Sequence, residues 1–222
     1  MTFRPTALAR TLAVALLSLA SLAEAAPVAL QNAGFESNFD SAGFVGSDGN
    51  VTFFYAPTGA SMGWSFGAGT GVAGNYSMLS AYEGTHFAFL QTATEALSQA
   101  FTLDQAATVD LGFALALRPG YQPGQSVQVL VDNQAVGTVA AAGSGWQAMN
   151  LSLGALTAGN HTLAFRGLGD FGTFGDTSAF LDAVQMNTQV AAVPEPGSIA
   201  LVLAGLMAVG TLGGRRSQVK RG

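Results

Sequence analysis

Short runs of alternating apolar and polar residues recur along the middle of the chain, and Gly, Asn, Asp or Pro bounds each run. This pattern is typical of half-buried β-strands. In the clearest run, residues 126–131, three valines fall on one face, and Asp132-Asn133-Gln134 leads into residues 135–139 as a predicted hairpin. Further strands are predicted at residues 85–91, 97–103, 109–117, 146–153, 161–166 and 179–186.

The spacing of these strands, about ten residues with turn signals between them, predicts an all-β fold, either a β-sandwich or a barrel. No stretch of residues 26–192 combines sustained helical periodicity with capping residues. Residues 67–74 and 82–84 are predicted to be loops. We therefore expect one ordinary domain between residues 26 and 192.

The first 25 residues have the pattern of a secretory signal peptide. Arg4 and Arg10 supply the positive start, and the apolar residues 11–23 are too few for a stable membrane span. Ala23-Glu24-Ala25 matches the A-x-A cleavage pattern, so Ala23 and Ala25 are the predicted cleavage residues. This predicts export through the Sec translocon and a mature chain that begins at Ala26.

The C-terminal end has three parts: Val193-Pro194-Glu195-Pro196, an uncharged run at residues 198–214, and a basic tail that contains Arg215 and Arg216. The two prolines predict an extended backbone around Glu195. As a helix the uncharged run would be about 25 Å long, slightly short of the hydrocarbon core of a bilayer. We expect it to span the membrane, with the basic tail in the cytoplasm.

This tail resembles the PEP-CTERM sorting signal of Gram-negative bacteria, which the exosortase membrane peptidase reads. The resemblance divides the chain into a signal peptide (1–25), a domain (26–192) and a sorting signal (193–222). It implies transient single-pass residence in the inner membrane, followed by release to the cell surface or extracellular matrix. An ordinary tail anchor that is never cleaved remains the alternative.

Charge and cysteine content narrow the classes of function. Residues 26–192 contain eleven acidic and two basic residues, a net charge of −9. This balance argues against binding to nucleic acid, which needs a basic surface, and is compatible with Ca²⁺. The chain has no cysteine, so disulfides, zinc–thiolate sites and iron–sulfur clusters are excluded.

A second resemblance rests on five short motifs in a fixed order. These are Asn32-Ala33-Gly34-Phe35-Glu36, Gly63-Trp64, Glu83-Gly84-Thr85, residues 96–103 (ALSQAFTL) and residues 180–184 (FLDAV). Together they resemble the galactose-binding-like jelly rolls, the fold of many carbohydrate-binding modules. The resemblance implies a single jelly-roll β-sandwich, and glycan binding is one function that this fold hosts.

Glu36 and Asp182 lie near the two ends of this domain. The resemblance implies that the first and last strands are neighbours and that these carboxylates hold a structural Ca²⁺. The alternative is that Glu36 caps a turn and Asp182 accepts backbone hydrogen bonds.

Exposed aromatic rings are the usual platforms for sugar rings. Trp64 and Trp146 are predicted to be buried, whereas Tyr121, Phe171 and Phe174 fall in Gly-rich loops and are the candidate ligand-binding residues. The alternative is that these three rings cover the edge of the core.

Two strings match catalytic motifs. Residues 59–63 match G-x-S-x-G and residues 69–74 match G-x-G-x-x-G, but no helix is predicted after either, as both motifs require. We therefore predict no catalytic residue and a chain that is not an enzyme. The predicted function is an exported, non-catalytic surface or matrix protein that binds exopolysaccharide. A ligand-free structural protein and a hydrolase acting on exopolysaccharide are the alternatives.

Overall fold

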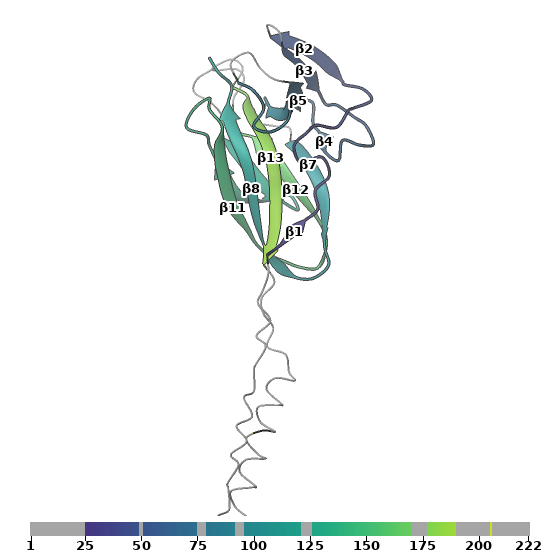
Figure 1. The fold of residues 1–222 in the computed structure, drawn as a ribbon, viewed down its shortest axis with the longest axis vertical. Helices are drawn as coiled ribbons and strands as arrows, with labels where there is room; N and C mark the ends of the chain where they lie inside the picture. The colour runs from purple at the N-terminus through teal and green to yellow at the C-terminus, as the bar shows by residue number, and fades with distance from the viewer. Residues whose placement is uncertain are drawn as a thin grey trace, which may run out of the picture. The chain divides into compact units, whose positions relative to one another are not determined.

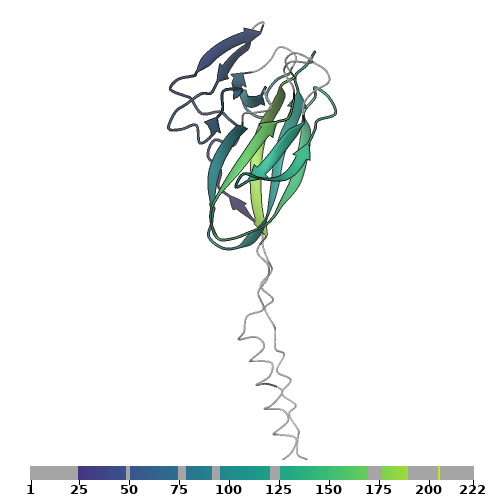
Figure 2. The same ribbon diagram turned by 180° about the vertical axis from the view of Figure 1, so that it is seen from behind.

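Two antiparallel sheets face each other in this computed structural model, which describes residues 25–48, 51–74, 79–91, 96–120, 126–169, 177–189 and Gly205 (Figures 1 and 2). Both sheets belong to one unit of the chain, Glu24–Ala191. The described part of this unit contains no helix. The predicted all-β class is confirmed, and the two-sheet arrangement is consistent with a jelly roll.

The larger sheet has the strand order β11-β8-β13-β6-β5-β3-β2, and β1 pairs in addition with β13. Its strands are β1 (Ala25–Val28), β2 (Phe44–Asp48), β3 (Val51–Tyr55), β5 (Thr70–Gly74), β6 (His86–Leu90), β8 (Ala107–Leu117), β11 (Gln147–Leu156) and β13 (Ala179–Gln189).

The smaller sheet has the order β10-β9-β12-β7-β4. Its strands are β4 (Ser65–Phe66), β7 (Ala96–Leu103), β9 (Val127–Val131), β10 (Gln134–Val139) and β12 (Gly159–Gly167). Asp132 and Asn133 join β9 to β10 with φ angles of 50° and 64°. These values are those of a type I′ turn, which matches the twist of the flanking strands. The predicted hairpin is therefore confirmed.

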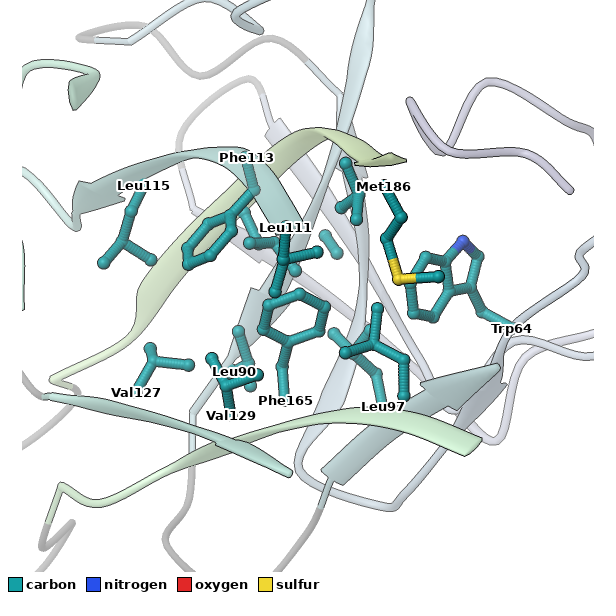
Figure 3. Close-up of a cluster of buried hydrophobic side chains, with 14 of the residues drawn as sticks. Trp64, Leu90, Leu97, Leu111, Phe113, Leu115, Val127, Val129, Phe165 and Met186 are labelled. Carbon is teal, nitrogen blue, oxygen red and sulfur yellow. The ribbon is translucent and has the colours of Figure 1, made fainter. Parts of the chain in front are cut away.

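The main hydrophobic core lies between the two sheets (Figure 3). Alternation along β8 explains how it forms: Leu111, Phe113 and Leu115 are buried in this core, so Gly112 and Ala114 between them face outward. From the smaller sheet, Val127, Val129 and Phe165 complete the packing, and the rings of Phe113 and Phe165 lie 5.2 Å apart.

A second hydrophobic cluster lies on the outer face of the larger sheet. Phe87 and Phe89 alternate with Ala88 and Leu90 of the main core, so β6 is buried on both faces. The Phe87 and Phe180 rings lie 4.7 Å apart, and Phe89 meets Phe53 edge-on at 5.4 Å. This explains the continuous apolar sequence of β6, which an alternating strand would not need.

All eight strands predicted from the sequence are present, with shifts of a few residues at their ends. Five strands were not predicted: β1, β2, β3, β4 and β5. The prediction of a loop at residues 67–74 was wrong for Thr70–Gly74, because β5 pairs with β3 and β6 on its two sides. Gly71 is not a loop signal here, since any side chain at this position would collide with the Phe54 carbonyl and the Phe89 ring.

No helix of the described residues is long and apolar enough to cross a membrane. The predicted span at residues 198–214 lies outside the described residues, except for Gly205, which is helical. The sorting motif, Val193 to Pro196, and the cleavage residue Ala23 also lie outside them, whereas Ala25 begins β1.

Candidate functional site

The Glu36 carboxylate holds the segment that leads into β6. Its Oε1 accepts hydrogen bonds from the backbone N–H groups of Thr85 and His86, both at 2.8 Å. Its Oε2 accepts the Thr85 hydroxyl at 2.9 Å and lies 3.1 Å from Nδ1 of His86. Burial raises the pKa of Glu36, but the hydrogen bonds from His86 and Thr85 outweigh it, and the pKa lies below its usual value. Glu36 is therefore ionised at neutral pH.

The Asp182 carboxylate lies beneath the same segment and is fully buried. Its Oδ2 accepts the N–H groups of Tyr82 and Glu83 at 2.9 and 3.1 Å, and its Oδ1 accepts that of Ala183 at 2.7 Å. Burial raises the pKa of Asp182 and is the larger effect, whereas the three N–H donors lower it; the resulting pKa is about 7. The three donors therefore compensate only in part for the hydration that the buried carboxylate has lost.

The two carboxylates predicted as calcium ligands thus fasten one segment, residues 82–86, at both of its ends. Both make the hydrogen bonds of the alternative interpretation. A Ca²⁺ ion would compete with the N–H donors for the same oxygens, so this arrangement does not fit a shared calcium site. No group of three or more His, Cys, Asp or Glu side chains that could hold a metal occurs within the described part of the chain. Calcium binding stays a prediction.

The other motifs of the galactose-binding-like resemblance also connect loops. Asn32 donates from Nδ2 to the Met62 carbonyl at 3.0 Å and accepts the Ser37 N–H at Oδ1. The Trp64 indole donates to the Asn32 carbonyl at 3.0 Å and is buried, as predicted. These motifs therefore have structural roles in the described part of the chain.

The candidate ligand-binding residues Tyr121, Phe171 and Phe174 lie outside the described residues. Trp146, predicted to be buried, is only half-buried, and its indole donates to the Ser80 carbonyl at 2.7 Å. Its ring packs against Phe87 at 5.8 Å and Tyr82 at 6.1 Å, and Tyr82 is 52% exposed. Tyr82, which the sequence did not single out, is therefore an accessible ring above the outer face of the larger sheet.

The G-x-S-x-G string forms no catalytic triad with the residues that the structure describes. The Ser61 hydroxyl donates to the Asn38 carbonyl at 2.9 Å. His161 pairs with the Asp132 carboxylate through Nδ1 at 2.7 Å, and its Nε2 lies 2.9 Å from the Thr157 carbonyl. Both imidazole nitrogens are thus engaged, and neither serves Ser61 as a base.

A polar groove lies on the outer face of β11, β8 and β13, which are neighbours in the larger sheet (Figure 1). It consists of two adjoining cavities of about 330 and 300 Å³ that share Asn150 and Gln185. We call it the sheet groove. One cavity reaches the exposed Tyr82 and Glu83, and the other reaches Asp110, Ser152 and Asn187.

Small residues make the floor of the sheet groove, and amides flank it. Gly112 and Ala114 face outward from β8, and a Cβ added at Gly112 would lie 3.0 Å from Nε2 of Gln185 and 3.4 Å from Oδ1 of Asn150. Both amides are exposed, and neither has a hydrogen-bond partner among the side chains and backbone groups that the structure describes. Their donors and acceptors are therefore available to a ligand.

Sequence reasoning missed this groove. Polar residues do alternate with buried or partly buried ones on β11 and β13, as at Asn150 and Ser152 of β11, but this pattern marks any sheet face exposed to water. The signal lies in the strand order, which brings Asp110, Asn150 and Gln185 together from distant parts of the chain.

No family model matches the chain, and no curated protein matches it. Among solved structures, the fold is similar to a Stig cyclase from Fischerella sp. TAU, in complex with an indole compound, at 16% identity and a TM-score of 0.50. The match covers 76% of this chain and 100% of the cyclase chain. At this identity the likeness concerns the fold alone.

Carbohydrate-binding modules give lower scores. TmCBM61 in complex with β-1,4-galactotriose matches at 14% identity and a TM-score of 0.47, over 72% of this chain and 97% of the module. The CBM22-1 xylan-binding domain from Paenibacillus barcinonensis Xyn10C matches at 16% identity and a TM-score of 0.43, over 68% of this chain and 99% of the domain.

Proposed function

We propose that this chain is an exported, exosortase-processed protein of the cell surface or extracellular matrix, which binds exopolysaccharide without chemical turnover. The observation that carries glycan binding is the sheet groove. It combines unpartnered amides, a floor of small residues and an exposed tyrosine at one end. This combination of an exposed aromatic ring and a few polar groups suits sugar rings and their hydroxyls.

The proposed route of export rests on the two ends of the chain. The signal peptide directs the chain to the Sec translocon, and the PEP-CTERM tail holds it briefly in the inner membrane for an exosortase-type peptidase. The mature domain has no basic surface that would attract nucleic acid, because its two basic residues are Arg118 and Arg166.

Catalysis is not part of the proposal. Glycoside hydrolysis needs two carboxyl groups on either side of one glycosidic bond. The described acids of the sheet groove, Glu83 and Asp110, line different cavities. Asp182, whose raised pKa would suit a general acid, is covered by the backbone of Tyr82 and Glu83.

Glycan binding is tested by electrophoresis of the full-length chain through gels that contain exopolysaccharide, together with an assay for new reducing ends. We expect retarded migration and no release of reducing ends. Migration unchanged by any polysaccharide would leave the ligand-free structural alternative, and new reducing ends would establish the hydrolase.

Sorting is tested separately by replacing Pro194 and Pro196 with Ala in cells that express the natural peptidase. The full-length chain should then accumulate in the inner-membrane fraction, whereas the unaltered chain should be shortened and leave it. A matched change at Ser198, which follows the motif, should have little effect. Equal shortening of all three chains would contradict processing at this motif.

A further inference from the structure

The charged side chains that line the sheet groove are all acidic. Its described lining contains two carboxylates, Glu83 and Asp110, and no basic side chain. The two basic residues of the mature domain are both engaged elsewhere. Arg118 is buried, with its guanidinium 5.4 Å from the centre of the Phe53 ring, and Arg166 of the smaller sheet donates to Gln128. A polyanion in this groove would therefore meet only like charge.

The polar groups of the groove suit hydroxyl groups instead. Each amide carries both a donor and an acceptor. Asn150 and Gln185 flank Gly112 from the two neighbouring strands, because β8 lies between β11 and β13. A sugar hydroxyl also donates and accepts, so it can hydrogen-bond to either amide in either direction. Any side chain larger than hydrogen at position 112 would enter the space between the amides. The groove is thus shaped to read neutral polar groups.

The groove is also elongated along the strands. Its outward positions on β11 run from Ala148 through Asn150 to Ser152, which places its two ends about 13 Å apart. Polar side chains recur at every second residue on β11 and β13, as at Asn150 and Ser152 or Gln185 and Asn187. A linear chain with hydroxyls along both edges matches this pattern.

From these observations we infer that the sheet groove binds a linear, uncharged polysaccharide that lies along β8, with its hydroxyls bonded to Asn150 and Gln185. The inference rests on the proposed glycan binding and adds the class of glycan and its contacts. Asp110 and Glu83 exclude acidic polysaccharides, such as those built from uronic acids, by charge repulsion.

Affinity electrophoresis with two sets of probes tests this selectivity. The full-length chain is purified in a polyoxyethylene detergent, which carries no sugar that could compete. Galactan, xylan and glucomannan serve as uncharged probes, and polygalacturonate, alginate and gellan as acidic ones. We expect retention by at least one uncharged probe and by no acidic probe. Retention by the uncharged probe should persist at about 1 M NaCl, where the Debye length is only ~3 Å.

Variants locate the binding in the groove. The double variant N150A/Q185A should bind the retained probe about tenfold more weakly, because two hydrogen bonds to the ligand are lost. The matched control Q134A removes an exposed amide from β10 of the other sheet and should bind as the unaltered chain does. All three melting temperatures should agree, since these side chains are exposed. D110N, which removes one charge from the groove, should weaken the exclusion of the acidic probes.

Each remaining outcome contradicts the inference at a different point. Retention by acidic probes that equals or exceeds retention by uncharged ones would overturn the class of glycan and leave glycan binding standing. Retention that N150A/Q185A leaves unchanged would overturn the groove as the site. Failure of every probe to retain the chain would overturn both this inference and the proposed function.

Discussion

The buried carboxylate of Asp182 accepts a hydrogen bond from the backbone N–H of Tyr82 at 2.9 Å, across 100 positions of sequence. Asp182 also accepts the N–H of Glu83, while Glu36 holds the other end of the same segment through Thr85 and His86. The tyrosine at the end of the sheet groove is thus positioned by a carboxylate that lines neither cavity. Asp182 therefore both stabilises the domain and positions Tyr82 and Glu83, which line one end of the groove.

The raised pKa of Asp182 predicts that stability falls as the pH rises. A carboxyl group with a pKa of about 7 in the folded state and about 4 in the unfolded state holds its proton more tightly when folded. Its contribution is therefore largest below pH 4 and is lost as the pH approaches 7, on the order of 4 kcal/mol in the free energy of unfolding. Urea unfolding between pH 4 and pH 8 measures this loss.

The variant D182N is the control for this prediction. At pH 5 the free energy of unfolding of D182N should be about 1 to 3 kcal/mol lower than that of the unaltered chain. The reason is that the NH₂ group of the new asparagine would face a backbone N–H, which is also a donor. The difference between the two chains should shrink as the pH rises from 5 to 7. A difference independent of pH would show that Asp182 does not titrate in this range.

Calcium should have little effect on the melting temperature. The oxygens of Glu36 and Asp182 already accept N–H groups, which a cation would have to displace. We expect the melting temperatures in EDTA and in excess Ca²⁺ to agree. In either condition the free energy of unfolding of E36Q, measured with urea, should be lower than that of the unaltered chain by about 1 to 2 kcal/mol. A rise in melting temperature with Ca²⁺ that E36Q abolishes would restore the calcium site predicted from the sequence.

The sequence was most informative where local pattern and local structure agree. The alternation of valines in β9 and the Asp132-Asn133 turn predicted a hairpin, and the structure has β9 and β10 paired across this turn. The motif around Asn32, Phe35 and Trp64 likewise indicated a fold whose loops these residues connect. Such features are decided within a few residues of chain or by motifs in a fixed order.

Features that depend on pairing across the sheet were not predictable in this way. The glycines of β5 suggest a loop until β3 and β6 are placed on its two sides. Gly112, Asn150 and Gln185 become one site only because β8 lies between β11 and β13. For the carboxylates, the sequence identified Glu36 and Asp182 as a pair near one site, but their partners are backbone N–H groups, which no side-chain pattern reveals.

The pair of His161 and Asp132 predicts a second dependence on pH. The hydrogen bond to Asp132 and the Thr157 carbonyl raise the pKa of His161, and the bond from His161 lowers the pKa of Asp132. Their contribution is full between the unfolded pKa of Asp132, near 3.8, and that of His161, near 6.5. It is lost as the pH rises through the higher folded pKa of His161, and also as the pH falls through the lowered folded pKa of Asp132. Because Asp132 is about half exposed, the loss should be about 1 kcal/mol or less. It should be absent in D132N, and an identical fall in that variant would contradict the pairing.

Substitution of Tyr82 distinguishes the sheet groove from the loops as the place of glycan binding. Tyr82 is 52% exposed and meets Trp146 edge-on at 6.1 Å, so Y82A should cost little stability. If a sugar ring stacks there, Y82A should weaken the retention of the bound polysaccharide about tenfold. Y121A, F171A and F174A make the matched comparison, because the sequence predicted binding at those rings. Loss of retention in these three variants with none in Y82A would move the site to the loops, whereas the opposite result would place it in the groove.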